Sequence, residues 1–90
     1  MSNSKEFTTA VETVVNLVTQ PTTDEMLKLY GYYKQAVVGD ININKPGFFS
    51  FKESKKWDAW NDNKGMNKFD SEVKYILYVN DLIQKYGLKK

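Results

Sequence analysis

The 90-residue chain contains no cysteine and no histidine. Without cysteine there is no disulfide framework and no thiol nucleophile. Without histidine, the usual general base at neutral pH and the commonest transition-metal ligand are missing. An enzyme is not excluded, but the side chains that most often carry such chemistry are absent. We therefore expect no catalytic residue, no metal site and no cofactor.

Arginine is absent as well, since all thirteen basic residues are lysines. The net charge of +2 is mild and does not indicate broad binding to a phosphate backbone. No apolar run approaches the roughly 18 residues that a membrane-spanning helix needs. Residues 1–6 lack the apolar core of a signal peptide. These features favour a soluble cytoplasmic protein with no nucleic-acid partner and no stable insertion into a membrane.

The length and a hydrophobic content of 41% predict one small domain over residues 1–90, with enough apolar mass for a single core. Apolar spacing predicts four helices. Thr22 and Glu25 form a capping-box pattern at the start of the second helix, and Asn67 is a good cap for the fourth. The predicted helices cover residues 4–18, 22–39, 52–64 and 67–87. A long connection over residues 40–50 joins the second helix to the third.

One face of the second helix combines aliphatic, phenolic and cationic side chains. At about 100° per residue, its members fall within one third of the circumference. A face used only for the core would not need a lysine, and a solvated face would not need two tyrosines. The mixture suits a ligand that is part apolar chain, part ring and part anion. These residues are Met26, Leu27, Tyr30, Tyr33, Lys34 and Val37.

Several motifs surround this face. Pro-Thr-Thr-Asp stands at residues 21–24, Tyr-Gly-Tyr-Tyr-Lys-Gln-Ala at 30–36, Gly-Asp-Ile-Asn at 39–42 and Lys-Trp-Asp-Ala-Trp at 56–60. In this order and spacing they resemble the acyl-CoA-binding protein family, over about residues 7–87. The resemblance implies an all-α four-helix bundle of up-down-down-up topology. It also implies non-covalent binding of medium- to long-chain fatty acyl-CoA esters, such as palmitoyl-CoA, by an intracellular carrier in lipid metabolism.

The resemblance also implies roles for individual residues. Tyr33 is expected to stack on the adenine, while Tyr30, Lys34 and Lys56 are expected to contact phosphates. Tyr75 matches a family tyrosine near the pantetheine and the thioester. Met26 and Leu27, one turn before Tyr30, are candidates to line the acyl groove, and methionine adapts to chains of varied length.

Each of these residues also has a purely structural interpretation. Tyrosines often span core and surface, a single lysine is usually a solvated charge, and Tyr75 lies on an apolar stripe of the fourth helix. Met26 and Leu27 could simply pack the bundle. Trp57 and Trp60 are interpreted as core anchors, and Lys52, Lys55 and Lys64 as surface charges.

Two positions depart from the family pattern. Val15 stands where a basic residue often reaches the phosphates, so no phosphate role is expected for the first helix. Val37 stands where a smaller residue is usual, and its side chain is on the predicted ligand face. Val15 bears on how the phosphates of the ligand are bound, and Val37 bears on the shape of the groove.

Three other functions stay open at this point. A single-stranded nucleic-acid module could use tyrosines interleaved with lysines, although the low net charge and the lack of arginine argue against it. A protein-interaction bundle could have lost ligand binding through Val15 and Val37. An esterase is the weakest alternative, because no nucleophile elbow is present. We expect the protein to be a monomer.

Overall fold

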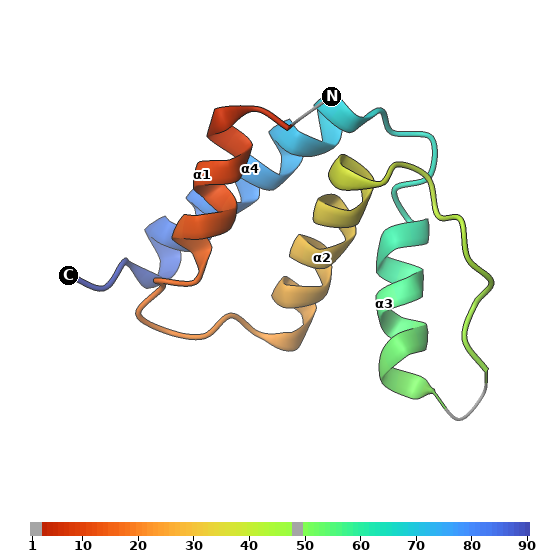
Figure 1. Cartoon of the computed structure of the whole chain (residues 1–90). Helices are drawn as coiled ribbons and strands as arrows, with labels where there is room; N and C mark the ends of the chain where they lie inside the picture. Colours follow the sequence, from red (N-terminus) through yellow and green to blue (C-terminus); the bar gives the residue numbers. More distant parts are fainter. Residues whose placement is uncertain (1–2, 48–49) are drawn as a thin grey trace.

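The computed structural model describes residues 3–47 and 50–90 and contains four α-helices (Figure 1). α2 and α3 run in one direction and α1 and α4 in the other, which is the up-down-down-up topology (Figure 1). The predicted all-α four-helix architecture is confirmed. The helices are α1 (Lys5–Val14), α2 (Thr23–Val37), α3 (Phe51–Asn61) and α4 (Lys68–Tyr86).

The helices form a flat assembly with α2 near its middle. α2 packs against α4 and against α3, and α1 packs against α4, while α1 and α3 do not touch within the described ranges. The Cα atoms extend over 41 × 31 × 15 Å, and the short dimension reflects this arrangement. α2 is therefore flanked by α3 on one side and by α4 with α1 on the other, so part of its surface stays uncovered.

The apolar core lies where α1, α2 and α4 meet. Ala36, Val79 and Leu82 are almost fully enclosed, and burying such side chains is the main favourable term in folding. Tyr32, Ile76 and Ile83 pack around the cluster from the flanks. The buried members are Phe7, Ala10, Leu17, Leu29, Ala36, Tyr75, Val79 and Leu82.

The first helix is shorter than predicted: it ends at Val14 rather than at residue 18. The chain then turns, and Leu17 pairs with Leu88 in an isolated antiparallel bridge. The backbone N–H of Val18 donates to the carbonyl oxygen of Gly87 at 2.9 Å. These contacts with the far end of the chain replace the last helical turn and leave Val15 73% exposed.

Two tryptophans of α3 hold the connection between α2 and α3. Trp60 is buried, as predicted, and its Nε1 donates to the Gly39 carbonyl oxygen at 2.7 Å. Trp57 is only partly buried, and its Nε1 donates to the Ile43 carbonyl oxygen at 2.8 Å, so it anchors the connection rather than the core. Residues 48 and 49 of the predicted connection lie outside the described part of the chain.

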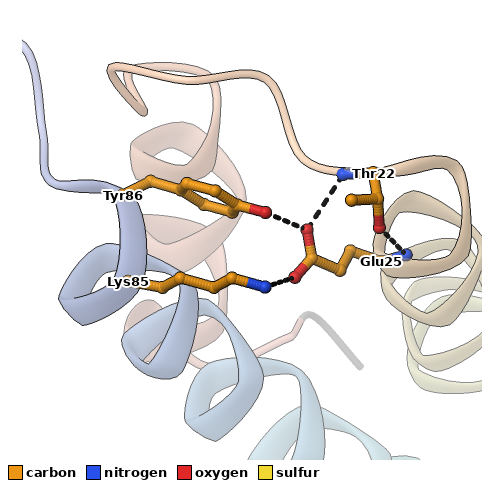
Figure 2. Close-up of polar contacts among 4 residues, drawn as sticks. All are labelled: Thr22, Glu25, Lys85 and Tyr86. Carbon is orange, nitrogen blue, oxygen red and sulfur yellow. Dashed lines mark hydrogen bonds and ion pairs between the residues drawn. The ribbon is translucent and has the colours of Figure 1, made fainter.

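The start of α2 is tied to the end of α4 through Glu25 (Figure 2). The predicted capping box is present: Thr22 Oγ1 accepts from the Glu25 N–H at 3.1 Å, and Glu25 Oε1 accepts from the Thr22 N–H at 2.9 Å. The same carboxylate accepts from Lys85 Nζ at 2.8 Å and from the Tyr86 hydroxyl at 2.6 Å. One side chain thus caps α2 and joins two chain segments far apart in the sequence.

These contacts predict how stability depends on pH. The donors Lys85, Tyr86 and Thr22 lower the pKa of Glu25 from its ordinary value of 4.5 to about 2. The stability that ionised Glu25 contributes is fully present above its unfolded-state pKa. It is lost as the pH falls from about 4.5 through 2. Glu25→Gln should flatten this part of the curve of urea midpoint against pH, and Glu12→Gln, at an exposed position of α1, should not. An unchanged acid limb in Glu25→Gln would contradict the prediction.

Candidate ligand-binding site

The face of α2 singled out from its sequence stays open in the folded protein. Leu29, Gly31, Gln35 and Ala36 are buried, and they hold the opposite side of the helix against its neighbours. The residues of the predicted face are instead exposed or half-buried. We call this surface the open face of α2, and its members are Met26, Leu27, Tyr30, Tyr33, Lys34 and Val37.

Two lysine–aromatic contacts join the open face to α3. Lys34 Nζ lies 4.8 Å from the centre of the Trp60 ring, and Lys56 Nζ lies 5.5 Å from the centre of the Tyr30 ring. The Lys56 ammonium also lies 3.7 Å from the carboxylate of Glu53. Such cation–π contacts are individually weak. They nevertheless place two ammonium groups and one phenol at the seam between α2 and α3.

A mainly apolar groove of about 340 Å³ continues from this seam toward the starts of α2 and α3. Met26 and Leu27 supply its apolar wall, and Tyr30 closes it toward the lysine–aromatic pairs. We call it the α2–α3 groove. Its lining residues are Thr23, Met26, Leu27, Tyr30, Lys52, Lys55 and Lys56.

Toward α1 and α4, the open face presents Tyr33. Its ring stacks near Phe7 of α1, with centroids 6.0 Å apart and planes at 24°, and lies 6.3 Å from the ring of Tyr75. Tyr33 remains 37% exposed, so part of it is free for a further stacking partner. Tyr33 and Lys34 therefore diverge from the same turn of α2 toward different flanks.

Tyr75 is a member of the core, with only 4% of its surface exposed. Its ring packs edge-on against Phe7 with centroids 5.1 Å apart. Burial raises the pKa of Tyr75 to about 12, and the neighbouring Tyr33 adds to the shift. The phenol is therefore protonated at neutral pH and can donate a hydrogen bond, but its predicted ligand contact stays a prediction.

A second hollow, of about 500 Å³, lies on the other side of the contact between α2 and α3. It shares Leu27 and Lys55 with the α2–α3 groove, and beside Tyr32 and Ala59 its lining includes three carboxylates, those of Asp24, Asp58 and Asp62. None of the tyrosines of the open face reaches it. An apolar tail is better matched by the smaller groove, because burying carboxylates against hydrocarbon is unfavourable.

Comparison with known proteins agrees with this geometry. The family model described as "Acyl CoA binding protein" matches residues 4–79. The chain belongs to the acyl-CoA-binding protein family. A protein of Saccharomyces pastorianus named "Acyl-CoA-binding protein 2" is 51% identical over 84 residues, which cover 93% of this chain and 97% of the relative.

Two further members of the acyl-CoA-binding protein family show the same likeness. "Acyl-CoA-binding protein homolog 1" of Caenorhabditis elegans is 47% identical over 81 residues, covering 90% of this chain and 94% of the relative. The crystal structure of Oryza sativa Acyl-CoA-Binding Protein 2 superposes with a TM-score of 0.86 at 36% identity. That match covers 90% of this chain and 88% of the other.

The two positions that depart from the acyl-CoA-binding protein pattern lie in different surroundings. Val37 is exposed at the last residue of α2, at the end of the open face. Val15 does not line the α2–α3 groove, and it lines another hollow, of about 380 Å³, with Leu17, Val18 and Lys89. The shorter first helix thus places Val15 in a turn, where a longer cationic side chain would have freedom to reach outward.

Three residues of the α2–α3 groove were not singled out from the sequence. Thr23 lines it from the first turn of α2, and Lys52 and Lys55 line it from α3. The lysines were interpreted as surface charges, and both are exposed. The sequence did carry a signal for these two lysines. Lys52 lies four residues before Lys56 and Lys55 lies one residue before it, which places all three on one side of the helix.

Two negative findings apply to the described residues. They include no group of three or more acidic, cysteine or histidine side chains arranged to hold a metal ion. Nor do they include a helix with both the length and the hydropathy required to cross a bilayer.

Proposed function

We propose that this protein binds medium- to long-chain fatty acyl-CoA esters non-covalently, and that it carries and buffers them without turnover. The observation that carries the proposal is the α2–α3 groove, a mainly apolar cleft that leads to the ammonium groups of Lys34 and Lys56. Membership of the acyl-CoA-binding protein family supports it. The tail would occupy the groove, and the nucleotide would lie across the open face.

The tail and the head would contribute in different ways. Burying a chain of about sixteen carbons is worth on the order of 10 kcal/mol before the costs of association and chain ordering, at about 0.8 kcal/mol per methylene. Stacking of the adenine on Tyr33 would add about 1–3 kcal/mol. Lys34, Lys56 and Tyr30 would supply charge-assisted hydrogen bonds to the phosphates. Tyr75 would face the pantetheine end, with its protonated phenol as a donor.

The proposal includes a cellular and an oligomeric setting. The chain would act as one acyl-CoA-binding domain over residues 1–90, as a monomer in the cytoplasm. It would have no catalytic residue, no nucleic-acid partner and no stable insertion into a membrane. Palmitoyl-CoA would be a representative ligand.

Native mass spectrometry tests the proposed function with a mixture of acyl-CoA esters. The purified protein, offered equal amounts of butyryl-, octanoyl-, dodecanoyl- and palmitoyl-CoA, should retain one ester per chain. The longer esters should dominate, because each added methylene buries more apolar surface. Retention of the four esters in equal amounts would contradict a role for the groove in binding the tail.

A gain of affinity is expected from Val15→Lys. A lysine there restores the cation that the family often has, and the position is exposed enough to accept it. Binding of palmitoyl-CoA should strengthen most at low ionic strength, because salt screens exposed charges. Titration at low and high salt measures the effect, with Val15→Gln as the uncharged control. Equal affinity of both variants at low salt would show that other groups already neutralise the phosphates.

A further inference from the structure

Phe51, the first residue of α3, is an unusually exposed aromatic side chain, with 71% of its surface accessible. The ammonium group of Lys55, one turn later, lies 5.1 Å from the centre of its ring. Lys52 follows directly and is exposed too. We call Phe51, Lys52 and Lys55 the α3 tip. It combines a large apolar group with two cations at one end of a helix.

The two cations of the α3 tip are not neutralised by nearby carboxylates. Neither Lys52 nor Lys55 has a carboxylate within 4 Å in the part of the chain that the structure describes. Two acids of α3 pair with other lysines: the Glu53 carboxylate lies 3.7 Å from the Lys56 ammonium, and the Asp58 carboxylate lies 3.0 Å from the Lys45 ammonium. Asp24, Asp58 and Asp62 line a hollow together with Lys55 and offset part of its charge, whereas Lys52 does not line that hollow. A positive excess remains at the tip.

The α3 tip is continuous with the α2–α3 groove. Lys52 and Lys55 belong to both, and Thr23 faces them across the groove from the first turn of α2. α2 and α3 begin at the same end of the molecule (Figure 1). The groove therefore opens beside Phe51, at the end where a flat surface could contact the starts of both helices.

We propose that the α3 tip docks reversibly on the surface of an anionic bilayer. Phe51 enters the headgroup region, where aromatic side chains are well accommodated, and Lys52 and Lys55 contact anionic headgroups. The attraction is short-ranged and weakens with salt. If the proposed acyl-CoA binding holds, the groove then opens toward the layer in which acyl chains dissolve, so that a tail can pass between bilayer and protein without crossing water.

Vesicle flotation with the full chain tests the docking surface. The vesicles are phosphatidylcholine alone, or phosphatidylcholine mixed with phosphatidylserine, at low and at high salt. The wild-type protein should float with the mixed vesicles at low salt and much less in the other conditions. Phe51→Ala should lower the partition coefficient on the order of tenfold, since the ring no longer leaves water. Lys52→Gln combined with Lys55→Gln should remove the difference between the two vesicle types.

Phe69→Ala is the matched control, because Phe69 is 70% exposed near the start of α4. Lys68 precedes it in the sequence, but none of the lysine–ring contacts among the described residues involves Phe69, so it represents an equally exposed phenylalanine without a cation on its ring. This variant should float like the wild type. Equal loss in Phe51→Ala and Phe69→Ala, wild-type flotation of Phe51→Ala, or no flotation of the wild type would each overturn the proposal.

Binding of a short, water-soluble ester separates this proposal from the proposed function. Octanoyl-CoA, titrated in buffer without vesicles, should bind Phe51→Ala as it binds the wild type, because Phe51 does not line the groove. Loss of flotation with this binding intact supports the docking surface. Absence of octanoyl-CoA binding in the wild type would overturn the proposed function and leave the flotation result to decide the docking surface alone.

Discussion

Lys34→Ala should lower the affinity for palmitoyl-CoA by at least about tenfold while the fold remains. A hydrogen bond to a charged group is worth about 1.5–3 kcal/mol, and tenfold corresponds to about 1.4 kcal/mol. Lys34 is half-buried beside Trp60, so its removal costs the folded state little. Isothermal titration gives the affinity, and thermal unfolding shows that the variant is folded.

Tyr33→Ala should have an effect of similar size through the adenine rather than the phosphates, because stacking is worth about 1–3 kcal/mol per base. Lys74→Ala is the control for charge, since Lys74 is exposed on α4 and lines neither hollow between α2 and α3. It should bind like the wild type. Wild-type affinity in both Lys34→Ala and Tyr33→Ala would refute the assignment of the nucleotide head to the open face.

Gly31→Val should destabilise the protein by about 1–3 kcal/mol, the usual cost of overpacking. Gly31 lies where α2 meets α3, and an added Cβ would come closer than van der Waals contact to the Ala59 carbonyl oxygen. It would also lie 2.9 Å from Asn63 Nδ2. Because the first obstacle is backbone, the two helices must separate. The gain in helix propensity over glycine, about 0.5 kcal/mol, does not offset this cost.

The urea midpoint measures this loss, provided that the slope of the transition stays constant. Gly47→Val is the matched control, since an added Cβ there meets nothing within 4 Å. It should unfold at nearly the wild-type midpoint. Equal midpoints for Gly31→Val and Gly47→Val would mean that α3 is not held at this contact.

The parts of the fold that could be predicted depend on neighbouring residues. The capping box of Thr22 and Glu25 is local, and so is the cap of α4, where Asn67 Oδ1 accepts from the Asp70 N–H at 2.7 Å. Gly87 ends α4 with a φ of 78°, a value that glycine adopts without strain. Such signals need no knowledge of the rest of the chain.

The features that escaped prediction depend on distant partners. α1 ends early because Leu17 pairs with Leu88. The third helix ends at Asn61 rather than at residue 64, and turns follow it. Nothing near Glu25 in the sequence indicates that Lys85 and Tyr86 meet its carboxylate. A helical period cannot supply these partners, because they come from the tertiary arrangement.

The candidate site likewise has parts that the local sequence predicts and parts that depend on distant partners. The residues of the open face of α2 share one side of the helix because of their helical spacing, and in the structure they are exposed or half-buried. The divergence of Tyr33 toward Phe7 and of Lys34 toward Trp60 depends on where α1 and α3 pack. The contribution of Lys52 and Lys55 to the groove likewise depends on the parallel course of α2 and α3. The ligand contacts themselves stay predictions until binding is measured.

Isothermal titration with palmitoyl-CoA, coenzyme A and palmitate tests the central claim most directly. The account predicts one tight site for the ester and far weaker binding of either half, because the groove holds the tail and the open face holds the head. Affinity of coenzyme A equal to that of palmitoyl-CoA would contradict it, since the groove would then contribute nothing. Absence of binding by all three would contradict it completely.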